Sequence, residues 1–170
     1  MISNVEINKD VKLSEHFSLG EMTKTSVKTA DGNIPSHVHI ENLRRLCRWL
    51  EMLREEWNRR YAEVRCKKED GRCSIEEPII INSGYRSPQV NKAVGGAPTS
   101  NHLTGCAADI RCQGKEQAIR YACILLDISD ESQEPFDELL IEQSAKSIWV
   151  HFAVRPEGNR RKVEFIIKKN

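Results

Sequence analysis

Two residues of one short segment could bind a metal ion together. His102 lies in a loop that Gly105 can bend sharply, and Asp109 lies seven residues later on a predicted strand. The alternation of side chains along that strand places Asp109 on the face opposite Ala108 and Ile110, and therefore away from the core. Imidazole nitrogens and carboxylate oxygens are both ligands of zinc. The segment can therefore supply two ligands to one ion.

A second histidine lies on a later predicted strand. Its apolar residues Ile148, Val150 and Phe152 form one face, so His151 points to the opposite face. A strand histidine in isolation is more often a hydrogen-bonded structural residue, so the surrounding sequence decides its interpretation. Two histidines and one aspartate would leave one position of a tetrahedral zinc ion open, as in catalytic zinc sites. Zinc in such a site lowers the pKa of a bound water to about 7 and polarises a carbonyl group.

Composition limits the classes of protein that could contain this site. The chain has 170 residues, of which 39% are hydrophobic and 30% charged, values typical of a globular protein, and we expect residues 1–170 to form a single domain. Its 26 Lys and Arg residues balance 25 Asp and Glu residues, which argues against a nucleic-acid partner. Its six cysteines include no C-x-x-C pair and are predicted to be free thiols.

No apolar run in the sequence is long enough to span a membrane. The N-terminal residues also lack an apolar segment after a basic start, which a secretory signal would require. We therefore expect the protein to be cytoplasmic as synthesised. We also expect it to be a monomer.

The predicted elements indicate an α+β fold with a mainly antiparallel sheet. The capping residues Ser18 and Glu21 predict a short helix, and Ser87 with Pro88 predicts another that ends at Gly95. Apolar residues at helical spacing predict two longer helices, at residues 40–64 and 115–128. Strands are predicted at residues 78–83, 106–110, 136–142, 148–154 and 162–167.

The strings around the candidate ligands resemble those of a known family. The chain contains S-x-H-x-x-G-x-A-x-D at residues 100–109, preceded by S-G-Y-R-S at 83–87 and followed by W-V-H at 149–151. Together they resemble the zinc D-alanyl-D-alanine carboxypeptidases and related peptidoglycan peptidases, a group that includes phage L-alanyl-D-glutamate endolysins and vancomycin-resistance dipeptidases. The resemblance extends from Leu13 to His151. It implies the fold shared with the hedgehog signalling domain, with helices packed on one side of the sheet.

The resemblance also implies roles for individual residues. His102, Asp109 and His151 would bind zinc. Arg86 would hold a substrate carboxylate or the developing oxyanion, a role that suits the fixed fork of a guanidinium group. Ser100 and Tyr85 would contribute to substrate binding. Arg86 could instead be a surface arginine in a turn, and Ser100 could be a loop serine that does not contact substrate.

The general base is the point at which this sequence departs from some relatives. Several have an acid three residues before the last histidine ligand, or a histidine two residues before it, where this chain has Ile148 and Trp149. Glu142 is the first candidate, because a hairpin that pairs it with His151 would place both side chains on one face. Asp137 is the second candidate. Either acid could instead be solvated or bound in a salt bridge.

The resulting interpretation is a zinc metallopeptidase that acts on peptidoglycan stem peptides. The sequence leaves open whether it is a D-Ala-D-Ala carboxypeptidase or an L-Ala-D-Glu endopeptidase, and whether its origin is phage, prophage or cellular. A phage-type release would bring it to the cell wall. The alternative is a non-catalytic, zinc-stabilised module of the same fold that binds cell wall or protein, for which the absence of an acid at Ile148 is the main support.

Overall fold

The computed structural model describes residues 11–30, 32–62 and 76–168. Five strands form one sheet in the order β1-β2-β4-β3-β5, and every neighbouring pair is antiparallel except β3 and β5. The structure therefore confirms the α+β class and the mainly antiparallel sheet. The strands are β1 (Ile81–Ser83), β2 (Ala107–Cys112), β3 (Glu138–Gln143), β4 (Ile148–Ala153) and β5 (Lys162–Ile167).

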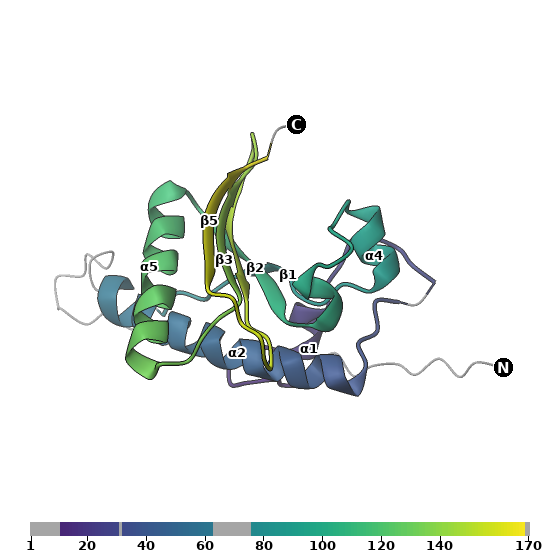
Figure 1. Cartoon of the computed structure of the whole chain (residues 1–170), viewed down its shortest axis with the longest axis horizontal. Helices are drawn as coiled ribbons and strands as arrows, with labels where there is room; N and C mark the ends of the chain where they lie inside the picture. Colours follow the sequence, from purple (N-terminus) through teal and green to yellow (C-terminus); the bar gives the residue numbers. More distant parts are fainter. Residues whose placement is uncertain (1–10, 31, 63–75, 169–170) are drawn as a thin grey trace.

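The two long helices cover one face of the sheet, and the short helix α4 lies on the opposite side (Figure 1). The prediction that helices pack on one side thus holds for the long helices alone. In the described ranges, no helix is long and apolar enough to cross a membrane. The helices are α1 (Leu19–Met22), α2 (His37–Trp57), the π-helical turn η1 (Asn58–Ala62), α4 (Pro88–Ala93), the 3-10 turn η2 (Asn101–Thr104) and α5 (Lys115–Ser132).

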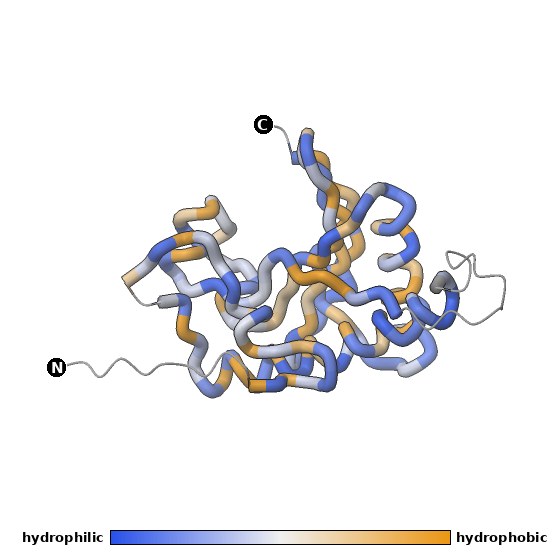
Figure 2. Tube along the Cα trace, turned by 180° about the vertical axis from the view of Figure 1, so that it is seen from behind, coloured by the Kyte–Doolittle hydropathy of each residue, from blue (hydrophilic) through white to orange (hydrophobic). Residues whose placement is uncertain are grey.

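Alternation along the strands separates the core from the site. Ile110, Val150 and Phe152 are buried against the long helices, where the rings of Trp49 and Phe152 lie 5.3 Å apart. Apolar and polar residues alternate along the tube in Figure 2, as expected for elements with one buried face. On β2 and β4, the residues that alternate with these core residues face away from the long helices. Those residues include Asp109 and His151.

Local capping explains where the helices begin. The hydroxyl of Ser18 accepts a hydrogen bond from the Glu21 amide, and Ser87 caps α4 with Pro88 at the first helical position, as predicted. Helix α2 begins three residues earlier than predicted, because Ser36 caps it through the His39 amide while the His39 ring accepts from the Ser36 amide.

The hairpin of β3 and β4 has a different register from the predicted one. Leu140 lies opposite His151, whereas Glu142 lies opposite Trp149, so the predicted pairing of Glu142 with His151 is wrong by two residues. The short turn at residues 144–147, closed by a 2.8 Å bond from the Ser144 amide to the Ser147 carbonyl, determines this register. A shift of two residues preserves the face. Glu142 therefore still lies on the same side of the sheet as His151.

The described cysteines are free thiols, as predicted. Cys47, Cys106 and Cys112 are buried and Cys123 is exposed. Cys66 and Cys73 lie outside the described residues.

Candidate metal centre

The structure brings His102, Asp109 and His151 together. Their ligand atoms all lie within 4.8 Å of one another, and the residues are only 2%, 9% and 7% exposed. The pairing of β2 with β4 places Asp109 directly opposite His151, and η2 brings His102 to the same point from the preceding loop. Asp109 Oδ1 lies 3.2 Å from His102 Nε2 and 3.0 Å from His151 Nδ1.

The second ring nitrogen of each histidine has an acceptor. His102 Nδ1 lies 2.6 Å from the Gly84 carbonyl oxygen, and His151 Nε2 lies 3.3 Å from Glu138 Oε2. Both partners can only accept, so these nitrogens carry the proton. In the neutral rings, His102 Nε2 and His151 Nδ1 then present their lone pairs to Asp109. This is how metal-binding histidines are usually oriented.

Such a donor set fits a zinc ion. Two lone pairs and a carboxylate oxygen at one buried point repel one another unless a proton or a cation lies between them. In the metal-free protein, burial lowers the pKa of His151, but the carboxylates of Asp109 and Glu138 outweigh it and raise this pKa to about 9. Burial conversely raises the pKa of Asp109, but the two imidazoles hold it well below its usual range. The site therefore requires positive charge beside Asp109.

The loop before β2 is shaped to present His102. Ser100 caps η2, with its hydroxyl accepting a hydrogen bond from the His102 amide at 3.3 Å. Gly105 ends η2 with φ at 73°, and a Cβ atom there would lie 2.7 Å from the His39 carbonyl oxygen. Only glycine suits both the positive φ and the close approach. Ser100, predicted to bind substrate, thus has a structural role in placing a ligand.

Arg86 lies beside Asp109. Its Nη2 donates to Asp109 Oδ2, and its Nε donates to the Ser83 hydroxyl at 2.8 Å. The two interactions fix the plane of the guanidinium group. Its side chain also lines a pocket of about 170 Å³ between the segment of residues 24–27 and α4. Arg86 therefore connects the candidate metal centre with a space that a substrate group could enter.

Tyr85 does not reach such a space. It is 4% exposed, and its ring stacks on that of His39 with the centroids 4.8 Å apart. A buried ring cannot contact substrate without rearrangement of its surroundings. The structure therefore gives Tyr85 a role in packing, and its predicted role in substrate binding stays a prediction.

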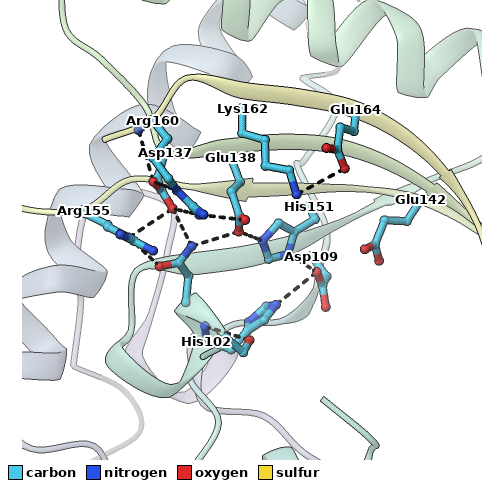
Figure 3. A network of polar contacts seen from close by, with 12 residues as sticks. His102, Asp109, Asp137, Glu138, Glu142, His151, Arg155, Arg160, Lys162 and Glu164 are labelled. Carbon is cyan, nitrogen blue, oxygen red and sulfur yellow. Dashed lines mark hydrogen bonds and ion pairs between the residues drawn. The ribbon is translucent and has the colours of Figure 1, made fainter. Parts of the chain in front are cut away.

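Glu138 was not among the predicted site residues, yet it lies beside His151. Its side chain also accepts from Asn101 Nδ2 at 2.9 Å and from Arg160 Nη2 at 2.8 Å (Figure 3). The bond with His151 is the main cause that lowers the pKa of Glu138, to about 2. A sequence signal was available, since Glu138 lies on the same face of its strand as Glu142. The predicted register directed attention to the wrong end of that strand.

Asp137, the second candidate for the base, is fully buried and engaged by arginines. Arg160 donates to both of its oxygens, and Arg155 Nε lies 3.1 Å from Oδ2. Burial raises the pKa of Asp137, but these arginines and Asn101 together lower it. The alternative interpretation as a salt-bridged acid therefore fits Asp137. Through these ion pairs, Asp137 links the start of β3 to the connection between β4 and β5.

Glu142 lies on the same face of the sheet as the candidate metal centre, and it has fewer polar partners than Glu138 (Figure 3). Its Oε2 forms an ion pair with Lys168 Nζ at 2.8 Å, and the same ammonium group lies 4.9 Å from the centre of the Trp149 ring. Glu142 itself is only 9% exposed, but the Lys168 side chain is half exposed, so this ion pair can give way to water or substrate on the side of Lys168.

Comparison with known families agrees with this geometry. A family model described as Peptidase M15 matches residues 63–151, more than half of the chain. The chain belongs to the Peptidase M15 family. M15 peptidases are zinc-dependent, and the matched segment contains His102, Asp109 and His151. No curated protein matches the chain significantly.

Membership supports the general part of the sequence interpretation. The chain is assigned by family to the zinc metallopeptidases, whose substrates are peptides. The match ends at His151, so β5 and its charged residues lie beyond it. Lys168 and Arg160, which contact the two acids on the site face of β3, therefore belong to the part of the chain that the family model does not match.

Proposed function

We propose that this M15 member hydrolyses peptide bonds of peptidoglycan stem peptides, as a D-Ala-D-Ala carboxypeptidase or an L-Ala-D-Glu endopeptidase. The observation that carries an enzymatic role is the set of three converging ligand atoms, whose number leaves one position of a tetrahedral zinc ion for the reaction. The strings shared with peptidoglycan peptidases support the substrate class. A hedgehog/DD-peptidase-like fold is part of the same proposal.

The protein's own residues would hold the ion and move the proton. His102, Asp109 and His151 are the ligands, with Glu138 and the Gly84 carbonyl fixing the two rings. Zinc, when bound, supplies a Lewis acid that activates water and polarises the scissile carbonyl. The remaining requirement is a base that takes a proton from the attacking water and returns it to the leaving amine.

Glu142 is the better of the two acids on this face of β3 for that role. The carboxylate of Glu138 is held by His151, Asn101 and Arg160, and removing it from them would release a metal ligand. Glu142 has its ion pair with a half-exposed lysine and can turn towards substrate. It also lies opposite Trp149, the position where some relatives have a histidine.

Arg86 would orient the substrate. Its Nε and Nη2 are engaged by Ser83 and Asp109, whereas Nη1 makes no hydrogen bond within the described residues. That group is available to a substrate carboxylate or to the oxygen that becomes negative during attack. The guanidinium is held rigidly by its other bonds, so it needs little reorganisation.

The test compares wild type with Glu142→Gln on isolated stem peptides and on cross-linked muropeptides. We expect one zinc per chain in both proteins, hydrolysis by wild type, and a decrease of kcat in the variant by about 10²- to 10⁴-fold. Product masses identify which bond is cut. Glu164→Gln is a matched control, because Glu164 on β5, like Glu142 on β3, is a sheet glutamate in an ion pair with a lysine, here Lys162.

Two results would change the proposal in different ways. Stoichiometric zinc without hydrolysis of any stem peptide by wild type would overturn the peptidase function and leave the binding module. Full activity of Glu142→Gln would remove Glu142 as the base but retain the enzyme. Zinc content is measured by elemental analysis in every variant, so that loss of metal is not mistaken for loss of the base.

A further inference from the structure

A larger pocket lies at the end of the sheet where β2 runs into α5. Its volume is about 590 Å³, and four segments contribute to its lining: the end of β2, the start of α5, the turn between β3 and β4, and Asn82 of β1. Arg111, in its lining, lies on the strand face opposite the buried Ile110 and Cys112. That is the face of Asp109. Arg111 therefore lines the pocket from the face of the candidate metal centre, whereas Cys112, Gln143 and Ile148 line it from the opposite face of the sheet.

Positive side chains converge on this pocket from three of these segments. Arg111, Lys115 and Lys146 are exposed, and no acidic residue contributes to the described lining. Within the described part of the chain, none of the three makes an ion pair. Like charges that share a concave surface repel one another, and a bound anion relieves this repulsion. The start of α5 contributes further positive potential.

The acids nearest in sequence are engaged elsewhere. Glu142 precedes the pocket residue Gln143, but it is paired with Lys168. Glu116 follows Lys115, but its carboxylate binds Arg120 on the next turn of the helix. Glu77, which lines a neighbouring pocket together with Arg111, accepts a hydrogen bond from Trp57 Nε1 at 2.9 Å. The two acids adjacent to the pocket residues in sequence therefore do not neutralise its positive charge.

The distance from the metal centre suits a peptide. Arg111 follows Asp109 by two residues and is paired across the sheet with Trp149, which precedes His151 by two. Two residues of a strand span about 7 Å, so the pocket begins roughly one to three residues of extended peptide from the ligands. A peptide with its scissile bond at the metal centre could place a nearby residue there.

From this arrangement we infer that the pocket is an anion subsite for a carboxylate of the peptide substrate. The carboxylate belongs to a residue about one to three positions from the cleaved bond. Arg111 supplies a planar fork for it, and Lys115 and Lys146 supply mobile ammonium groups. This inference rests on the proposed peptidase function, because it concerns the substrate of the same metal centre.

The kinetic test uses peptide substrates that differ by one carboxylate. Each cleavable peptide is compared with an analogue in which the side-chain carboxylate is an amide and with another in which the C-terminus is an amide. Wild type should prefer one of the acidic forms in kcat/KM by about tenfold or more, the effect of one lost charged hydrogen bond. The preferred form identifies the source of the carboxylate. The R111Q/K115Q/K146Q variant should lose the preference.

A binding test separates this inference from the proposed function. The probe is an alanyl-glutamate dipeptide with a reduced, uncleavable peptide bond, titrated calorimetrically into zinc-loaded wild type and the triple variant. The amidated analogues of the probe provide the comparison. Binding of the acidic probe should weaken about tenfold in the triple variant. This measurement remains valid even when wild type hydrolyses no peptide.

The controls and contrary results are specific. Arg48→Gln removes an exposed positive charge from α2, outside the pocket. It should leave unchanged both the kcat/KM preference for the acidic peptide and the binding of the acidic probe. All changed residues are exposed, and thermal unfolding of each variant checks that the fold is retained. Equal kcat/KM for acidic and amidated peptides in wild type would overturn the subsite. Equal binding of the acidic probe by wild type and the triple variant would also overturn it.

Discussion

The orientation of two imidazole rings determines what the centre can bind. His102 would use Nε2 and His151 would use Nδ1, because the opposite nitrogen of each ring is held by an acceptor. The two acceptors differ in kind. Gly84 offers a neutral backbone carbonyl, whereas Glu138 offers a charged side chain that two further residues hold. The orientation of His151 is therefore the more sensitive to substitution.

Removing the Glu138 carboxylate should weaken zinc binding. We expect Glu138→Ala to raise the zinc dissociation constant by about 10- to 100-fold, because His151 loses the partner that fixes its ring. Glu138→Gln retains an oxygen that can accept from Nε2 and should show a smaller loss. Competition with a chromophoric chelator measures both. Glu164→Gln is the control, and an unchanged zinc affinity in Glu138→Ala would exclude the orienting role.

The sequence predicted the ligands at this scale but not their supporting partners. His102, Asp109 and His151 could be found because strand alternation and a distinctive string both indicate them. Strand alternation places Glu138 on the same face as Glu142, but it does not predict the contact of Glu138 with His151, because that contact depends on which residue of β3 lies opposite which residue of β4. A short turn determines that register, and a shift of two residues leaves the alternation pattern unchanged.

At the scale of elements, one turn places His102 against the strand that carries Asp109. Gly105 ends η2 and leads into β2, with its Cα close to the His39 carbonyl of α2. Gly95, beyond the end of α4, has a similar φ of 69°, but a Cβ there would have nothing within 4 Å. The two glycines therefore separate the effect of backbone conformation from that of close approach.

Replacing the two glycines with alanine should have unequal effects. Gly95→Ala should lower the free energy of unfolding by about 1–2 kcal/mol, the cost of a positive φ. Gly105→Ala should cost more than that, because α2 or η2 must also move, and it should weaken zinc binding. Urea unfolding and chelator competition measure the two quantities. Equal destabilisation with unchanged zinc affinity would show that the approach to His39 is unimportant.

Local elements were predictable because their causes lie within a few residues. Ser18, Ser36 and Ser87 each cap a helix through the amide three residues ahead, although the role of Ser36 was missed. The parallel pairing of β3 with β5 has no such local cause. It arises because the chain leaves β4, crosses β3 and pairs along its free edge, which depends on the packing of the whole sheet.

At the scale of the molecule, the centre exists only when distant segments have assembled. His102 and Asp109 come from one segment, and His151 comes from a strand more than forty residues later. Lys168, directly after β5, then lies beside Glu142. The two strands that carry Asp109 and His151 are direct neighbours in the sheet. Zinc bound to all three ligands would link these segments in the folded state, and the unfolded chain offers no comparable site.

Zinc should therefore stabilise the whole fold by mass action. At a free zinc concentration of about 100 times the dissociation constant, the added free energy of unfolding is about 2.7 kcal/mol. For a chain of this size we expect Tm to rise by roughly 5–10 °C over the protein treated with a chelator.

His102→Ala and His151→Ala should lose this response, because each lacks one of the three ligands. His37→Ala is the matched control, since His37 is exposed at the start of α2 and lies outside the centre. Calorimetric unfolding at several zinc concentrations measures the response of all four proteins. An equal rise of Tm in wild type and in both ligand variants would show that zinc stabilises the chain at another place, such as its free cysteines.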